Sequence, residues 1–139
     1  MKQLLKLIYL GLFAGIVLAG ILILLHTWTN NPAYILLFNV DYIPVLKNLK
    51  PNSVIGVIFH FVFCTISVVG LFYLLKMIDR ERQAPLYIYI YTFGSAILYF
   101  LTFFSVKPPF VTDLLSWFYW TLAHTIYGFI VGLTIKNWI

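Results

Sequence analysis

Two histidines and a cysteine stand inside hydrophobic stretches of this chain. His60 and His124 each lie in a segment long enough to cross a lipid bilayer, and Cys64 follows His60 after one helical turn. Ionisable side chains are costly inside a membrane, so they commonly mark a functional site there. Imidazole and thiolate bind zinc or copper, two imidazoles hold a haem iron, and imidazole also gains and loses a proton close to neutral pH. These three side chains are therefore candidates for a ligand site or for a proton-linked site.

The elements that carry these residues are expected to be transmembrane helices. Of the 139 residues, 63% are hydrophobic and 9% are charged, whereas about a quarter of the residues of a soluble domain are charged. A bilayer core about 30 Å thick requires about 20 apolar residues per helix. Four apolar stretches reach this length and predict helices over about residues 7–28, 53–76, 86–106 and 114–136. We predict an all-α fold, an integral membrane four-helix bundle that forms one transmembrane domain over residues 1–139.

The first stretch follows Lys2 and Lys6, as the apolar core of a secretory signal peptide also would. Its uninterrupted apolar run of 19 residues is longer than the about 7 to 15 residues of a signal peptide, and no small-residue cleavage site closes it. We expect a retained helix, with cleavage as the alternative.

Basic residues predict the orientation, because cytoplasmic loops of membrane proteins are enriched in lysine and arginine. With both termini in the cytoplasm (N-in, C-in), the inner side carries six basic residues and the outer side three. The net charge of +5 is then explained by basic loops beside anionic lipid. No nucleic-acid partner is expected, because no soluble fold presents a basic patch. The inner residues are Lys2, Lys6, Lys76, Arg80, Arg82 and Lys136, and the outer ones are Lys47, Lys50 and Lys107.

The connection between the first two helices, about residues 31–50, is too apolar for a polar linker. The Asn-Asn-Pro sequence at 30–32 ends the first helix, because proline lacks an amide donor and disfavours a helical residue before it. The apolar run 34–38 that follows is too short to span a bilayer. We predict an interfacial or re-entrant segment at the outer membrane surface.

Stripes of small residues predict close helix packing, because residues four apart share a helix face and small ones let backbones approach. One stripe lies on each of the first, second and fourth helices, and two of them include the histidines. Cys64 and His124 each stand 12 residues before a lysine, roughly 18 Å along a helix. The two histidines and Cys64 therefore converge if these helices touch. The stripes are Gly11, Gly15 and Ala19; Gly56, His60 and Cys64; and His124, Gly128 and Gly132.

Three roles are open for the histidines. A metal or haem site would use His60 and His124, but a third firm ligand is missing because Asp41 and Asp113 lie in outer loops. A hydrogen-bonded pair would hold the helices in register for about 1 kcal/mol or less. Acidification would instead charge the imidazoles, which titrate at about pH 6.5 in water, and change the packing. Cys64 by itself is expected to pack as a small apolar residue.

Aromatic side chains gather near the starts of the third and fourth helices. Tryptophan and tyrosine are enriched at both membrane interfaces, so we expect an aromatic belt there, with an aromatic cofactor box as the alternative. The residues concerned are Tyr87, Tyr89, Tyr91, Trp117, Tyr119 and Trp120.

Nothing in the sequence predicts an enzyme. No arrangement of nucleophile, base and acid is visible, and no phosphate-binding loop. All four acidic residues lie in predicted loops, so catalysis is not expected.

Several short segments suggest a family. They are residues 11–17 (GLFAGIV), 56–63 (GVIFHFVF), 108–110 (PPF) with Asp113 and Trp117 after it, and 123–127 (AHTIY). In this order they resemble the YagU family of small bacterial inner-membrane proteins, whose members are usually longer in the outer segment. The resemblance implies a multi-pass protein of the bacterial inner (plasma) membrane, associated with acid resistance and without established catalytic activity. The turn at Pro108 and Pro109, with Asp113, is expected to order the outer face.

Three functions from different classes follow from these residues. The first is a link to acid tolerance through the intramembrane histidines. The second is the binding of haem or a transition metal by His60 and His124. The third is a non-catalytic interaction subunit of a larger membrane complex, in which the glycine stripes would mediate a homo-oligomer or bind a membrane protein partner.

Overall fold

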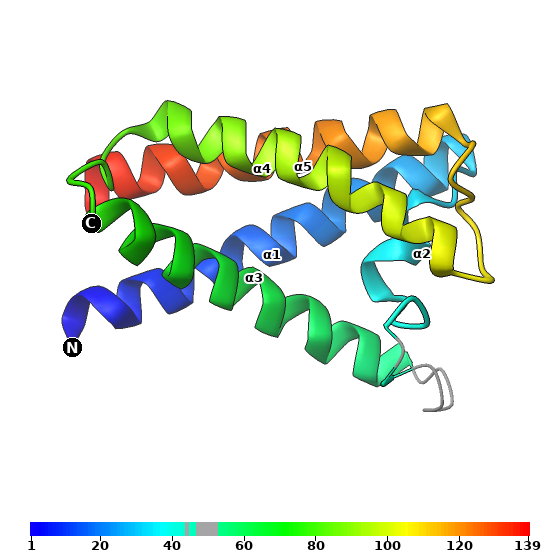
Figure 1. The fold of residues 1–139 in the computed structure, drawn as a ribbon, viewed down its shortest axis with the longest axis horizontal. Helices are drawn as coiled ribbons and strands as arrows, with labels where there is room; N and C mark the ends of the chain where they lie inside the picture. Colours follow the sequence, from blue (N-terminus) through cyan, green and yellow to red (C-terminus); the bar gives the residue numbers. More distant parts are fainter. Residues whose placement is uncertain (44, 47–52) are drawn as a thin grey trace.

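The computed structural model describes residues 1–43, 45–46 and 53–139. Within these ranges every regular element is helical, and four long apolar helices pack as a bundle (Figure 1). The predicted fold class is confirmed, and helix length and composition make this a multi-pass membrane protein embedded in a lipid bilayer. The elements are α1 (Lys2–Thr29), the short α2 (Ala33–Phe38), α3 (Ser53–Lys76), α4 (Ala84–Leu98), the 3-10 helix η1 (Tyr99–Phe104) and α5 (Leu114–Trp138).

Two spans differ from their predicted limits. α1 begins at Lys2 instead of residue 7, because lysine and glutamine are good helix formers that extend the helix toward the N-terminus. The Lys6 ammonium donates to the carbonyl oxygen of Trp138 at 2.7 Å. The third span is α-helical only to Leu98 and then tightens into η1, as helix ends often do. The hydroxyl of Tyr99 ties this end to the carbonyl oxygens of Phe110 and Asp113, both at 3.1 Å.

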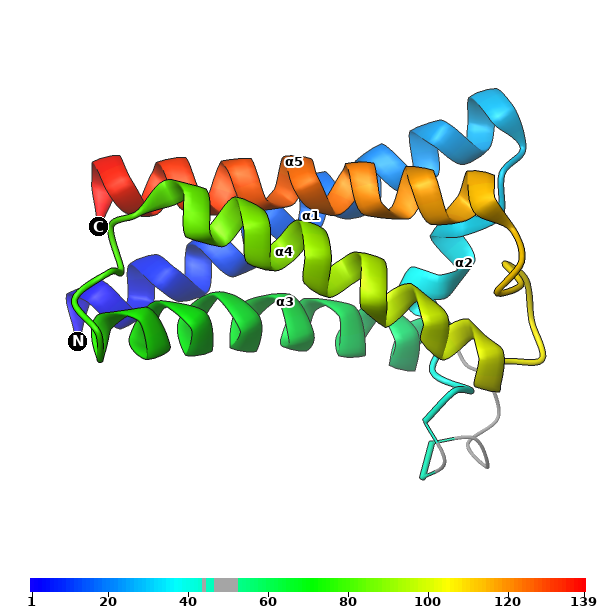
Figure 2. The ribbon, with the colours of Figure 1, turned by 45° about the horizontal axis from the view of Figure 1, so that its top comes forward.

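The four spans form two tight pairs. α1 packs along α3 and α5, and α4 packs along α5, whereas α3 and α4 pack little on each other. Both termini lie at one end of the bundle, the terminal end, as the N-in, C-in prediction requires (Figure 1). The opposite end, the far end, holds α2 and the connection from η1 to α5 (Figure 2). Which side of the membrane each end faces stays a prediction.

The glycine stripes lie in contacts within the chain. A Cβ atom on Gly11 would stand 2.7 Å from Thr65 Cα, and one on Gly132 would stand 2.7 Å from the carbonyl oxygen of Ala84. A Cβ atom on Gly56 would overlap the carbonyl of Phe38 in α2. The structure therefore shows these glycines packed against the chain's own helices.

The predicted outer segment enters the bundle in the part that the structure describes. Ala33, Leu36 and Leu37 share one face of α2 and are buried between α1, α3 and α5. Residues 44 and 47–52 of this segment, and with them Lys47 and Lys50 of the orientation argument, lie outside the described residues. α2 thus forms part of the bundle interior at the far end.

Candidate functional site

A cavity of about 520 Å³ lies between α3 and α4. These two helices form its sides, and its back wall comes from α1, α2 and α5. Apolar side chains make up most of the lining, and a few polar groups interrupt it. It exists because α3 and α4 each pack on another helix and little on one another.

The cavity has a mouth on the outer surface of the bundle. Phe63 of α3 and Ile90 and Leu98 of α4 all line the cavity. The same side chains are 51%, 43% and 43% exposed, so they form the rim of an opening. Because the exposed surface of a transmembrane bundle faces lipid, this opening is directed toward the acyl chains of the bilayer.

His60 lies on the side of α3 that packs against α1, and 4% of its surface is exposed. Its Nε2–H donates to the carbonyl oxygen of Gly15 in α1 at 3.0 Å. A carbonyl oxygen accepts only, so the proton of the neutral ring lies on Nε2 and the Nδ1 atom is an acceptor. Cys64 Sγ lies 3.8 Å from that Nδ1 atom and supplies its thiol hydrogen there.

His124 projects from α5 and is half-buried in the cavity wall. Its Nδ1–H donates to the carbonyl oxygen of Trp120 at 2.8 Å, one turn back along the same helix. This bond places the lone pair of the neutral ring on Nε2. Among the described residues, Nε2 has no hydrogen-bond partner.

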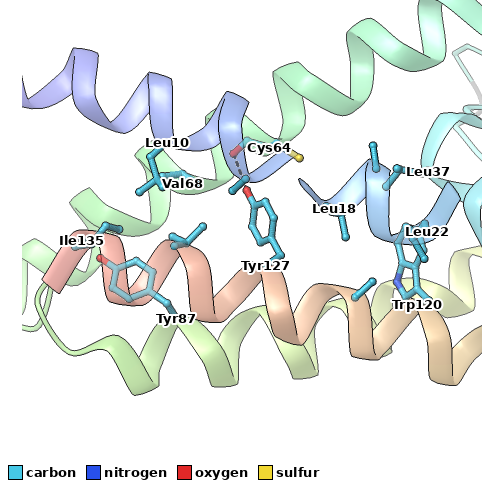
Figure 3. Close-up of a cluster of buried hydrophobic side chains, with 14 of the residues drawn as sticks. Leu10, Leu18, Leu22, Leu37, Cys64, Val68, Tyr87, Trp120, Tyr127 and Ile135 are labelled. Carbon is cyan, nitrogen blue, oxygen red and sulfur yellow. Dashed lines mark hydrogen bonds between the residues drawn. The ribbon is translucent and has the colours of Figure 1, made fainter. Parts of the chain in front are cut away.

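A chain of hydroxyl groups joins three helices toward the terminal end of the cavity. Tyr91 of α4 donates to Ser67 Oγ of α3 at 3.3 Å, and Ser67 donates to the carbonyl oxygen of Cys64 at 2.9 Å. Tyr127 of α5 reaches the same carbonyl at 3.2 Å (Figure 3). These bonds bridge α3 to α4 and α5 where no small residues bring the backbones together.

The short loop of residues 39–43 after α2 borders the far end, where Tyr42 and Ile43 line the cavity. The amide of Asn39 donates to Asp41 Oδ1 at 2.6 Å and to Ser105 Oγ at 2.9 Å, so the loop is tied to the end of η1. The backbone N–H of Val106 also donates to Asp41 Oδ2 at 3.3 Å. Burial, and secondly the charge of Asp41, raise the pKa of Tyr42, which therefore stays a neutral hydroxyl.

The structure brings together the three side chains singled out from the sequence. His60, Cys64 and His124 all line this cavity. In the described part of the chain, no three histidine, cysteine, aspartate or glutamate side chains are grouped to hold a metal ion. The predicted turn contains a cis peptide bond between Pro108 and Pro109.

Asp113 caps α5 rather than joining the cavity. Its Oδ1 atom accepts a hydrogen bond from the backbone N–H of Ser116 at 3.1 Å. This is the usual role of an aspartate before the first helical residue. The turn before α5 thus fixes where this helix begins.

The aromatic belt prediction is wrong for several of its residues. Tyr87 is fully buried, Trp120 is 8% exposed and Tyr91 lines the cavity. Their polar atoms find partners inside the protein, as when the Trp120 indole N–H donates to the carbonyl oxygen of Ser95 at 3.0 Å. Tyr89, 60% exposed, is the member that faces outward as expected.

Gly94 and Ser95 of α4 contribute to the cavity although the sequence argument did not select them. A Cβ atom on Gly94 would meet no other atom within 4 Å, so this glycine leaves space beside it. The signal in the sequence is a short Gly-Ser-Ala run in the middle of the third apolar stretch. Such a run reduces side-chain volume at one level of the bundle.

No family model, curated protein or solved structure matches this chain. The resemblance to the YagU family therefore stays a prediction. Function must be inferred from the cavity and its polar groups.

Proposed function

We propose that this protein binds a lipophilic small molecule of the bilayer in the cavity between α3 and α4. The observation that carries the proposal is the cavity itself, about 520 Å³ in volume, apolar, and rimmed by exposed side chains. Ligand sites in proteins generally measure about 300 to 1,000 Å³ and combine an apolar lining with a few convergent polar groups. His124 supplies such a group, because its Nε2 lone pair has no partner in the described residues.

The size of the cavity lies within the usual range of small-molecule sites, about 300 to 1,000 Å³. The cavity holds about 520 Å³, which suits a chain or ring system with a compact head group. The hydroxyl chain at one end and Tyr42 at the other limit its length along the bundle.

A filled-cavity variant tests the proposal. Gly94 lines the cavity, and a Cβ atom there would meet no other atom within 4 Å, so Gly94→Leu adds side-chain volume at the cavity wall. Gly20→Leu is the matched control, since Gly20 also has open space beside it but lies on the exposed face of α1, outside the cavity. The probe is an alkyl diazirine in nanodiscs, and the measurement is saturable labelling of the peptide that carries His124 and Tyr127.

We expect Gly94→Leu to reduce this saturable labelling about tenfold or more, because the added side chain removes the binding space. Gly20→Leu should label like the wild-type protein. Equal labelling of the wild-type and Gly94→Leu proteins would show that the cavity does not hold the probe.

An acid response is the second candidate, favoured by the placement of two imidazoles in one apolar cavity. Protonation of His60 would add a charge beside buried apolar groups and would remove the acceptor that Cys64 Sγ faces at 3.8 Å. The resemblance to the YagU family supports the same role. We expect a pH-dependent change in accessibility of Cys64 to a thiol reagent, and its loss in the double variant His60→Gln, His124→Gln. An unchanged acid response in that variant would refute this candidate.

A further inference from the structure

Almost all the polar N–H and O–H groups that line the cavity donate hydrogen bonds within the protein. The N–H groups of His60 and His124 donate to backbone carbonyls. Tyr91, Ser67 and Tyr127 use their hydroxyl hydrogens in the chain that ends on the carbonyl of Cys64. A ligand head group in this part of the cavity therefore meets few free donors.

Two further donors are also occupied. The Ser95 hydroxyl donates to the carbonyl oxygen of Thr92 at 3.0 Å, and the Trp120 indole donates to the carbonyl oxygen of Ser95 at 3.0 Å. Tyr42 is the exception, because its hydroxyl has no hydrogen-bond partner in the described ranges. It lies at the far end of the cavity, beyond the level of His124 and the hydroxyl chain.

What the middle of the cavity offers is an acceptor. The Nε2 lone pair of His124 is unpartnered among the described residues, and the Nδ1–H bond to Trp120 at 2.8 Å prevents the neutral ring from presenting a donor in its place. A ligand oxygen that can only accept would face this lone pair without forming a bond. A ligand hydroxyl would donate to it and satisfy both groups.

We propose that the cavity selects lipophilic molecules whose head group carries a hydroxyl, such as alkylphenols or long-chain alcohols, over analogues that can only accept hydrogen bonds. This inference rests on the proposed binding function and specifies its ligand. The hydroxyl donates to His124 Nε2, and the apolar tail leaves through the mouth between Phe63 and Leu98. Sites built around a hydrogen bond reject analogues that lack it far more sharply than apolar pockets distinguish sizes.

A matched pair of competitors tests this selectivity. In nanodiscs of zwitterionic lipid, a 4-alkylphenol and its methyl ether compete with the alkyl diazirine for labelling of the peptide that carries His124. The two compounds differ in the hydroxyl hydrogen but share the tail and ring. We expect the phenol to compete at a concentration about tenfold lower than the ether, as one satisfied hydrogen bond provides.

Substitutions at His124 identify the acceptor. His124→Phe should remove the preference for the phenol, because competition by the phenol becomes weaker while competition by the ether stays the same. His124→Gln should keep most of the preference, because the amide oxygen of glutamine also accepts a hydrogen bond. His26→Phe is the matched control, since His26 lies outside the cavity and donates to the carbonyl oxygen of Asn31 at 3.0 Å. It should retain the full preference.

The outcomes separate this inference from the proposed function. Equal competition by phenol and ether in the wild-type protein overturns the hydroxyl selectivity. A full preference in His124→Phe overturns the role of His124 Nε2 as the acceptor. Either result leaves cavity binding in place. Failure of both compounds to compete, together with wild-type labelling of Gly94→Leu, overturns cavity binding itself and the selectivity with it.

Discussion

α3 packs closely against α1 on one side, here called the seam, and borders the cavity toward α4 on another side. On one side of α3, Gly11 and Gly15 of α1 allow contact with the backbone and side chains of Thr65 and Cys64. On the side of the cavity, the large side chain of Phe63 forms part of the lining and is 51% exposed. Because apolar side chains gain little by leaving lipid for protein, helix pairing in a membrane depends on such close approach. Small residues on both α1 and α3 therefore accompany close packing, whereas the cavity is lined by large side chains such as Phe63 together with Gly94.

Enlarging a seam glycine should have the largest effect. Gly11→Leu pushes a side chain into Thr65 Cα, which lies 2.7 Å from the Cβ position, so α1 and α3 must separate. We expect a loss of about 3 kcal/mol or more in the free energy of unfolding, at the upper range for overpacked cores. Thermal unfolding in detergent, followed by circular dichroism, measures it.

Gly94→Leu is the comparison variant for this experiment, because it adds the same side chain on the cavity side. Its Cβ position meets nothing within 4 Å, and its stability should remain within about 0.5 kcal/mol of wild type. A similar loss in both variants would show that the α3/α4 face is as tightly packed as the seam.

The seams could be predicted from the sequence, whereas the cavity could not. Gly11, Gly15, Gly128 and Gly132 recur at the helical period, and the structure packs them against neighbouring helices. Long apolar runs likewise predicted the four spans. The glycine spacing and the apolar runs can each be recognised within a single helix, so they predict which face packs closely without knowledge of the neighbouring helix.

The cavity arises because α3 and α4 pack little on one another, and the sequence of a single helix does not show which neighbour it packs against. The positions of His60 and His124 on small-residue stripes indicated an inward orientation, but not that both rings border open space. The belt prediction is wrong for Tyr91 and Trp120 because tyrosine and tryptophan suit both a membrane interface and a buried hydrogen bond. Only the partner, Ser67 for Tyr91 and Ser95 for Trp120, decides between the two.

Hydrogen bonds replace small residues where α5 meets the cavity side of α3, and removing one should have a moderate effect. Tyr127→Phe deletes the donor to the carbonyl oxygen of Cys64, which keeps the bond from Ser67. We expect a loss of about 1 kcal/mol in the free energy of unfolding. Tyr89→Phe, at a side chain 60% exposed, is the control and should change stability little. If both variants unfold like wild type, the hydroxyl chain does not support this wall.

Titration of Tyr42 should give the smallest effect and concerns the far end of the cavity. Burial and then Asp41 raise the pKa of Tyr42 in the folded protein, whereas an unfolded tyrosine titrates at about pH 10. The neutral hydroxyl therefore stabilises the fold below about pH 10, and this contribution is lost as the pH rises through the raised pKa. The difference in tyrosinate absorbance between wild type and Tyr42→Phe isolates this one group.

Asp41→Asn should lower the pKa of Tyr42 only slightly, since burial is the larger cause of its shift. Asp79→Asn, in the connection at the terminal end, should leave the pKa of Tyr42 unchanged. Titration of Tyr42 at the ordinary value would mean that residues 39–43 do not shield the Tyr42 hydroxyl from water.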